Sequence, residues 1–239
     1  MKNHSLLKKQ FILEKNFAEK ILSSSKSIQR RNLIKQAYQN LDTMKEEHLG
    51  TLKQEVNVSL LLVFFITRLF SSPTKTSVLE IGCGTGDLCI ALSQKGYLVT
   101  GIDISSSRIK QAKHKTSPSI HHCEFVWEDF FDYYRKKRFD LIINDNVLEH
   151  IHPDDVDVFL KKCHSLLNPG GCLLTYTPNA MTGPHDVSKY FLPKGSITQG
   201  LHLKEYTFAQ ITRKLKMAGF ENINTWPFGP KVSALFGIY

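Results

Sequence analysis

Three features that the sequence lacks narrow the class of protein. No apolar run approaches the roughly 20 residues of a transmembrane helix, because the most apolar stretch, residues 60–70, is short and contains Arg68. No apolar segment follows the N-terminal lysines as it does in a signal peptide. The five cysteines form no C-x-x-C pair, which argues against a disulfide framework or a cysteine-bound zinc ion. We therefore expect a protein of the reducing cytoplasm.

The sequence also lacks internal repeats and low-complexity tracts. Its 239 residues, 41% of them hydrophobic, suffice for one sizeable core, so we expect a single domain with an added segment. The net charge of +9 is compatible with nucleic acid, an acidic substrate or weak association with an anionic membrane surface. The lysines are scattered, however, and the one dense basic cluster, residues 135–138, is interpreted as a solvated loop.

Two patterns divide the chain near residue 50. Residues 1–50 are polar, with apolar side chains at helical spacing, which predicts two or three helices and a further helix that continues toward Phe70. Beyond it, apolar strand-length runs alternate with amphipathic segments, as in a parallel sheet covered by helices. The expected strands are 77–81, 98–102, 124–127, 139–143, 172–177, 220–225 and 232–238. The expected helices are 87–94, 106–115, 154–167 and 207–218, with a turn at N-P-G-G, 168–171.

The most informative segment is V-L-E-I-G-C-G-T-G, residues 78–86. An apolar run that ends in closely spaced glycines indicates a buried strand turning into a helix, where backbone and helix N–H groups approach a ligand closely. A dinucleotide site, G-x-G-x-x-G, needs its third glycine at position 87, where Asp87 stands. Glu80, before the first glycine, favours a ligand that carries positive charge over a pyrophosphate.

This run resembles the first motif of class I S-adenosylmethionine (SAM)-dependent methyltransferases, and later segments fit the same family in the same order. The resemblance implies a Rossmann-like, seven-stranded, mostly parallel sheet with an antiparallel last strand. Residues 1–50 would form an N-terminal helical cap, and residues 51–239 the SAM-binding methyltransferase domain. The group includes ubiquinone-type enzymes, so we expect methylation of a small-molecule acceptor at oxygen or carbon, such as a quinone-like, phenolic or enolic compound.

Acidic residues follow the expected strands, at the sheet edge where such folds bind ligands. Asp103, about twenty residues after the glycine turn, is expected to bind the ribose hydroxyls; its alternative role is to cap the next helix. The resemblance assigns Asp129 to the adenine amino group, with Glu128 as the alternative, and Glu80 to the ammonium group, unless it pairs with a lysine. The full expected cofactor set is Glu80, Gly82, Cys83, Gly84, Gly86, Asp103, Ile104, Asp129, Phe130, Asn144 and Asp145.

The acceptor side is less well defined. Methyl transfer from a sulfonium depends mainly on positioning, and a base is needed only where the acceptor must lose a proton, for which histidine is suited. His150 and His185 are the catalytic candidates, and the expected substrate-binding residues are Tyr38, Tyr190 and His202. The E-H pair at 149–150 is similar to the metal-dependent E-x-x-E-H of ubiquinone-type O-methyltransferases. Because Asn146 stands at the first acid, no metal is expected.

Two other functions stay open. The sequence N-D-N-V at 144–147 differs from the N-P-P-Y-like sequence with which nucleic-acid methyltransferases hold a flipped base. This difference argues against a nucleic-acid substrate. An RNA or protein methyltransferase nevertheless stays as the first alternative, and the positive charge is the only support for RNA. The second is a SAM-binding protein without turnover, since a fold does not determine a function; the intact glycines, Asp103 and Asp129 argue against it.

Overall fold

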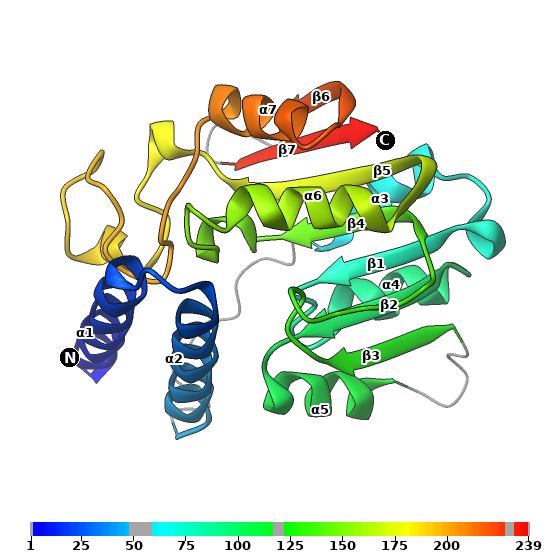
Figure 1. Cartoon of the computed structure of the whole chain (residues 1–239). Helices are drawn as coiled ribbons and strands as arrows, with labels where there is room; N and C mark the ends of the chain where they lie inside the picture. The colour runs from blue at the N-terminus through cyan, green and yellow to red at the C-terminus, as the bar shows by residue number, and fades with distance from the viewer. Residues whose placement is uncertain (1, 48–58, 117–121, 228–231, 239) are drawn as a thin grey trace.

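A pair of long helices stands beside one twisted sheet in the computed structural model, which describes residues 2–47, 59–116, 122–227 and 232–238 (Figure 1). The helices are α1 (Lys2–Ser23), α2 (Ser27–Glu47), α3 (Ser59–Leu69), α4 (Asp87–Gln94), α5 (Ser106–Lys115), α6 (Val156–Leu166) and α7 (Phe208–Met217). The strands are β1 (Ser77–Ile81), β2 (Leu98–Asp103), β3 (Cys123–Trp127), β4 (Phe139–Asp145), β5 (Leu167–Pro178), β6 (Glu221–Pro227) and β7 (Val232–Ile238).

The strand order in the sheet is β3-β2-β1-β4-β5-β7-β6. Strands β1 to β5 pair in parallel, and β7 runs antiparallel to both β5 and β6. This confirms the expected α/β architecture with a parallel sheet. The order reverses beside β1, whose neighbours are β2 and β4, and ligands bind at the carboxyl ends of the strands at such a reversal.

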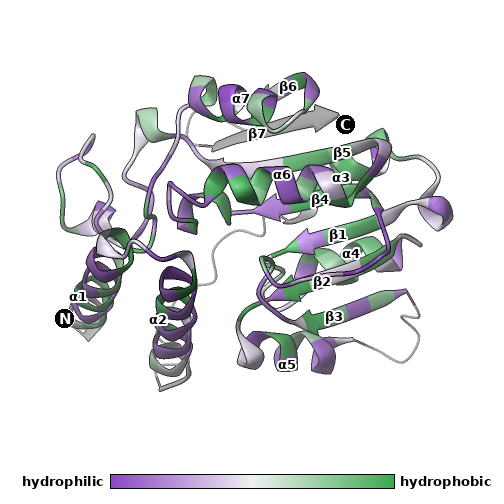
Figure 2. Ribbon diagram, in the orientation of Figure 1, coloured by the Kyte–Doolittle hydropathy of each residue, from purple (hydrophilic) through white to green (hydrophobic). Residues whose placement is uncertain are grey.

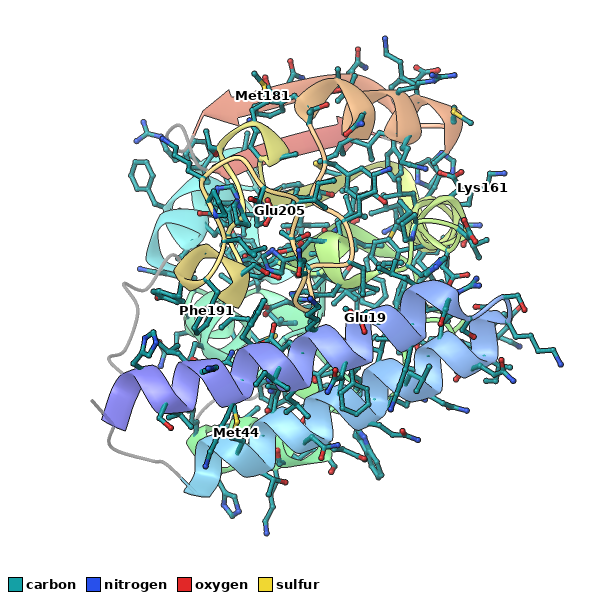
Figure 3. All side chains as sticks on the ribbon, turned by 90° about the vertical axis from the view of Figure 1, so that its left-hand side faces the viewer. Glu19, Met44, Lys161, Met181, Phe191 and Glu205 are labelled. Atoms are coloured by element: carbon teal, nitrogen blue, oxygen red, sulfur yellow. The ribbon has the colours of Figure 1, made fainter. Side chains whose placement is uncertain are left out.

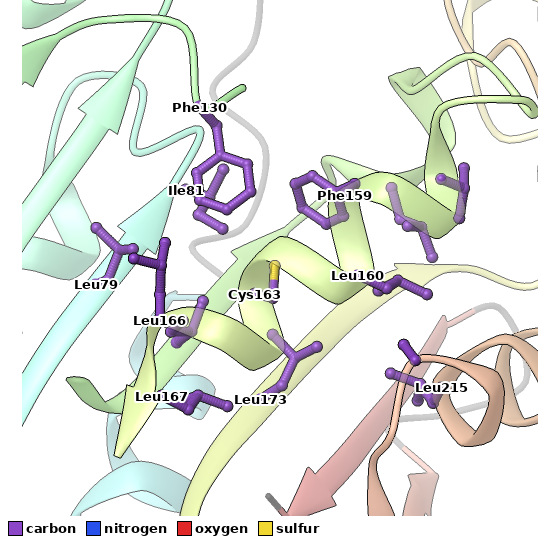
Figure 4. Packing of buried hydrophobic residues seen from close by; sticks show 14 of the residues in the cluster. Leu79, Ile81, Phe130, Phe159, Leu160, Cys163, Leu166, Leu167, Leu173 and Leu215 are labelled. Atoms are coloured by element: carbon purple, nitrogen blue, oxygen red, sulfur yellow. The ribbon is translucent and has the colours of Figure 1, made fainter. Parts of the chain in front are cut away.

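Side chains of β1 alternate between two apolar cores, because successive side chains of a strand point to opposite faces. Leu79 and Ile81 join the core beneath α6 and α7, which includes Phe159 and Leu160 (Figure 4). Val78 joins the core beneath α3 and α4. All five residues of β1 are buried, as expected for a strand covered on both faces, and green apolar segments mark these central strands in Figure 2.

The N-terminal helices form a third apolar cluster with the loop that follows β5. Ala18 and Ile21 of α1 pack with Ala37 and Leu41 of α2 and with residues 201 and 203. Figure 3 shows α1 and α2 running side by side, and in Figure 1 the arrowheads of β1 and β3 point toward α2. The pair therefore lies at the ligand-binding edge of the sheet.

Two sequence expectations differ from the structure or lie outside it. The N-P-G-G segment is part of β5, where Gly170 has φ 77° and the register with β4 shifts between Phe139 and Leu141. The glycine therefore permits an irregularity within the strand in place of the expected turn. The expected continuation of a helix from the cap to Phe70 involves residues 48–58, which are outside the described ranges; α2 ends at Glu47 and α3 begins at Ser59. None of the helices in the described ranges has the length and apolar character of a membrane span.

Candidate functional site

A cleft lies where the carboxyl ends of β1, β2 and β4 meet α2. Its wall is formed by residues 81–82, 102–104, 128–131, 146–147 and 150–151, with Arg108, Phe159 and, from α2, Arg31, Ile34 and Tyr38. Of the expected cofactor residues, Gly82, Asp103, Ile104, Asp129 and Phe130 are on this wall; of the expected acceptor residues, Tyr38 and His150 are.

The glycine turn after β1 requires glycine for two different reasons. Gly82, Gly84 and Gly86 all have positive φ, at 70°, 53° and 79°, a conformation that other residues rarely adopt. A Cβ on Gly86 would also lie 2.6 Å from the Phe125 ring, so this glycine lets α4 begin close to β3. A Cβ on Gly84 would meet no atom within 4 Å. The backbone at Gly84 is therefore exposed to open space, as a turn that receives a ligand requires.

Asp103 joins this turn to the end of β2. Its Oδ2 accepts the Gly84 N–H at 2.9 Å and its Oδ1 accepts the Ser105 N–H at 2.8 Å. Burial raises the pKa of Asp103, while these two hydrogen bonds act in the opposite direction. Helix α5 is capped by the Ser105 side chain, which accepts the Arg108 N–H, so Asp103 is not needed as a cap. Each carboxylate oxygen retains acceptor capacity for a ligand hydroxyl.

Asp129 already has cationic partners. Its Oδ1 accepts the Phe131 N–H at 3.0 Å, and its Oδ2 lies 3.3 Å from Arg31 Nη1 and 3.4 Å from Lys35 Nζ of α2. The neighbouring Phe130 is buried on the cleft wall. A ligand that hydrogen-bonds to Asp129 therefore competes with α2 for this carboxylate.

One face of α2 contributes more to the site than the sequence indicated. Arg31, Ile34, Tyr38 and Asp42 recur at helical spacing and face the sheet edge. Asp42 accepts hydrogen bonds from Arg108 Nε and Nη2 at 2.9 and 2.8 Å and from Ser105 Oγ at 2.6 Å. The Arg108 guanidinium lies 5.0 Å from the centre of the Tyr38 ring. Burial raises the pKa of Tyr38 well above its usual range, so its hydroxyl stays protonated.

His150 borders the cleft with one ring nitrogen engaged. Its Nδ1 lies 2.8 Å from the Leu201 carbonyl oxygen, and because a carbonyl only accepts, this nitrogen carries the proton and Nε2 has the lone pair. Burial, together with the nearby His202, lowers the pKa of His150 to about 3. The imidazole is therefore neutral at physiological pH.

His202 lies behind His150, with the ring centroids 4.8 Å apart. Its Nδ1 is 2.8 Å from Glu205 Oε1 and its Nε2 is 4.0 Å from Glu149 Oε1. Burial acts to lower the pKa of His202, but these carboxylates outweigh it and the pKa is raised. Glu149 is fully buried; its Oε2 accepts the Thr177 hydroxyl at 2.9 Å, and burial raises its pKa to about 7.

These three residues form the only group of potential metal ligands found in the described parts of the chain. One ligand atom each of Glu149, His150 and His202 lies within 4.8 Å of the others. Two imidazoles and a carboxylate fit a divalent cation, and Glu149 Oε1 is buried without a hydrogen-bond partner among the described residues. The Asn146 amide, in contrast, donates to Asp145 Oδ1 at 2.7 Å. The expectation of no metal rested on Asn146; the third potential ligand in the structure, His202, is distant in sequence.

Several expected cofactor residues are not on the cleft wall. Glu80 shares the face of β1 that is covered by α4, and its Oε2 accepts the Cys89 thiol at 2.8 Å. Cys83 packs in the same core. Asn144 is buried and donates to Thr175 Oγ1 at 3.0 Å. Asp145, at the end of β4, is also off the cleft wall, and burial raises its pKa to about 6.

Three expected acceptor-side residues are not on the cleft wall: His202, which lies behind His150, and His185 and Tyr190. Both ring nitrogens of His185 have partners, with Nδ1 2.9 Å from Glu205 Oε2 and Nε2 3.1 Å from Thr182 Oγ1. This histidine therefore orients Glu205 and is not available as a base. The Tyr190 side chain is 53% exposed, beneath the Lys189 ammonium. Both were predicted because they follow β5, but the loop after β5 extends past the cleft.

Comparisons with known proteins identify a methyltransferase domain in this chain. A model of the methyltransferase domain matches residues 57–225. A ubiquinone biosynthesis O-methyltransferase from Bradyrhizobium diazoefficiens is 35% identical over 127 residues, which cover 50% of this chain and 49% of the relative. The corresponding protein from a Chelativorans species is 34% identical over 134 residues, covering 52% and 51%. The chain spans about half the length of the curated relatives it matches.

Solved structures share the fold at low sequence identity. The 1,6-didemethyltoxoflavin-N1-methyltransferase of Burkholderia thailandensis, with bound 1,6-didemethyltoxoflavin and S-adenosylhomocysteine (SAH), has a TM-score of 0.64 at 16% identity and covers 90% of this chain and 92% of that one. The magnesium protoporphyrin IX methyltransferase of Synechocystis, with bound SAH, has a TM-score of 0.63 at 17% identity, covering 87% and 99%.

Proposed function

This chain belongs to the class I SAM-dependent methyltransferases, and we propose that it transfers the methyl group of SAM to a small molecule. The proposed acceptor is methylated at oxygen or carbon and is a quinone-like, phenolic or enolic compound; the relatives named for ubiquinone biosynthesis support this class. The observation that carries the proposal is the position of Asp103 and Asp129 on one cleft wall beside the glycine turn. Nucleoside cofactors bind at this edge of open α/β sheets.

The cofactor half of the cleft uses these two aspartates differently. We propose that Asp103, held by two backbone N–H groups, accepts hydrogen bonds from the ribose hydroxyls. Asp129 accepts the adenine amino group, and Phe130 packs against the ring. To bind the adenine amino group, Asp129 gives up its contacts with Arg31 and Lys35.

Residues 1–50 thus act as a cap on the domain formed by residues 51–239, and cofactor binding alters the contacts of the cap.

Methyl transfer is an in-line displacement with a neutral leaving group, so the chain contributes mainly by alignment. Alignment of two reacting groups supplies about 7–11 kcal/mol in favourable cases. His150 is the proposed residue on the acceptor side, because its Nε2 lone pair is free while Nδ1 is fixed by Leu201. This nitrogen can accept a hydrogen bond from an acceptor hydroxyl and orient its oxygen toward the methyl group.

Calorimetric titration of the full chain with SAM and SAH tests the cofactor assignment. Asp103→Ala is expected to weaken SAM binding about 10- to 100-fold, because hydrogen bonds to a charged group contribute about 1.5–3 kcal/mol. Glu128→Ala is the matched control: Glu128 is also an acid on the cleft wall, but it faces Arg135 and should leave SAM affinity within about threefold. A larger loss for Glu128→Ala than for Asp129→Asn would reassign the adenine contact.

Turnover is tested by SAH release with a panel of catechols, quinols and enols. SAH release with one of these acceptors, lost in His150→Ala while SAM still binds, supports the proposal. A protein that binds NAD and neither SAM nor SAH overturns it. Methylation of RNA, with affinity that falls steeply with salt, would replace the small-molecule acceptor with a nucleic acid.

A further inference from the structure

Glu149, His150 and His202 lie together although they come from two separate segments. Glu149 and His150 end the short turn after β4, and His202 belongs to the long loop after β5. We propose that these three side chains bind a divalent transition-metal ion of the zinc class, with His202 supplying the ligand that an acid at position 146 supplies in an E-x-x-E-H site. This deepens the proposed function, on which it rests for the acceptor that the ion would face.

Both histidines are oriented as metal ligands are. A ligating histidine almost always holds its second ring nitrogen on a carbonyl or carboxylate oxygen, which fixes the tautomer and the ring. His150 does so through Nδ1 and Leu201 O, and His202 through Nδ1 and Glu205 Oε1, each at 2.8 Å. The Nε2 atoms of both rings are then left for a cation.

Glu149 supplies the second, independent observation. Its side chain is fully buried, Oε2 is fixed by Thr177, and Oε1 has no hydrogen-bond partner within the described ranges. A buried carboxylate oxygen without a partner is costly. The nearest cationic group is His202 Nε2 at 4.0 Å, which is too far for a hydrogen bond. A cation between the two atoms would satisfy both.

The ligand types determine the class of ion. Imidazole nitrogen suits zinc, iron, nickel and copper, whereas magnesium prefers oxygen ligands and retains its waters. Asn146, bonded to Asp145, offers no charge that would restore an oxygen-rich site. An ion of this class with three protein ligands can take a further ligand, and His150 lies on the cleft wall. A bound ion of this kind supplies Lewis-acid stabilisation to an acceptor oxygen; His150 then serves as a ligand.

Binding requires the cluster to contract. Bonds of about 2.0–2.2 Å to a tetrahedral ion hold ligand atoms roughly 3.5 Å apart, whereas the three atoms are now within 4.8 Å. Glu149 is fixed by Thr177 of β5, whereas His150 is bonded to Leu201, the residue next to His202. A shift of the loop after β5 would therefore carry both histidines toward Glu149.

The test is titration of the tag-free, chelator-treated full chain with Co²⁺, followed by calorimetry and visible absorption, with Zn²⁺ competition. One Co²⁺ per chain is expected, displaced by Zn²⁺. His202→Ala and His202→Gln should weaken Co²⁺ binding about 100-fold or more, and Glu205→Gln about 10- to 100-fold, as for other groups that orient a ligand. His114→Ala is the control: this histidine lies in the last turn of α5 and outside the cluster, so Co²⁺ affinity should change less than about threefold.

SAM affinity, measured in chelator, reports folding and tests the proposed function separately. Wild-type protein that binds SAM but binds Co²⁺ no more tightly than His202→Ala overturns the metal site and leaves a His202–Glu149 ion pair. Mg²⁺ bound as tightly as Co²⁺ overturns the assigned class of ion. Co²⁺ binding that depends on His202 in a protein without SAM affinity supports the metal site and removes the proposed function.

Discussion

Replacing Glu80 with glutamine should stabilise the protein above neutral pH and have little effect near pH 5. Glu80 is 4% exposed in the core beneath α4. Burial is the main cause that raises its pKa from 4.5 to about 8; the Cys89 thiol acts in the opposite direction, and Asp145 raises the pKa further. Glutamine removes the ionisable group and keeps an oxygen that can accept the thiol hydrogen bond.

The size of the effect follows from proton linkage. A carboxyl group with a higher pKa in the folded than in the unfolded state takes up protons on folding, so its contribution to stability is complete below pH 4.5 and is lost as the pH rises through about 8. At about 1.4 kcal/mol per pH unit, wild-type protein loses roughly 3 kcal/mol from this group between pH 5 and pH 8. The new amide leaves an N–H₂ group unpaired, which costs about 1–2 kcal/mol. The Glu80→Gln variant should therefore gain about 2 kcal/mol over wild type at pH 8.

Urea unfolding of both proteins at pH 5 and pH 8, with reductant to keep Cys89 a thiol, measures this difference. Titrating groups that do not interact with Glu80 cancel between wild type and variant. A stability difference that is the same at both pH values would refute the reasoning that burial sets the protonation of Glu80. SAM affinity should change less than about threefold in the variant, because Glu80 lies off the cleft wall; a tenfold loss would restore the assignment of Glu80 to the SAM ammonium group.

Two further predictions concern the glycine turn and the cap. Gly86→Ala should lower the free energy of unfolding by about 2–3 kcal/mol, because φ is 79° and the Cβ would lie 2.6 Å from Phe125. Gly84→Ala should cost only about 1 kcal/mol, because a Cβ there would meet open space. Equal losses for the two variants in thermal unfolding would contradict the steric argument. Arg30→Ala should cost about 3–5 kcal/mol and make α1 and α2 susceptible to limited proteolysis, because it removes a buried bidentate pair with Asp155 at 2.6 and 2.8 Å. The double variant with Asp155→Ala should lose less stability than Arg30→Ala alone.

The cofactor side of the fold was predictable because its signals are local. The glycine spacing placed the end of β1 and the start of α4, and Asp103 marked the end of β2. Glu80 shows the limit of such reasoning. The pattern located it correctly before the glycines, but the alternation of side chains along β1 turns its carboxylate toward Cys89 instead of the cleft.

The acceptor side could not be read from local pattern, because tertiary contacts assemble it. His202 reaches Glu149 and His150 only through the loop after β5, which is fixed by Glu205 and by the backbone at Leu201. The helical cap was predicted, but the role of Arg31 in it was missed. A signal was present: Arg31 shares a face with Ile34 and Tyr38 on α2, and a face that mixes charge with buried apolar and aromatic groups is typical of a helix that contacts a polar site.

The contacts of α2 differ in how readily a ligand can replace them. Arg30 and Asp155 form a buried bidentate pair at one end of α2, and losing one partner of such a pair is costly. The contacts of Asp129 with Arg31 and Lys35 are longer, at 3.3 and 3.4 Å. Lys35 is about one-third exposed, so its contact contributes only about 0–1 kcal/mol, and Arg31 has a second, shorter contact with Asp132 at 2.7 Å. A hydrogen bond from adenine to Asp129 can offset the two contacts of Asp129. Cofactor binding is therefore expected to release the contacts of Arg31 and Lys35 with Asp129, while Arg31 stays paired with Asp132 and Arg30 with Asp155.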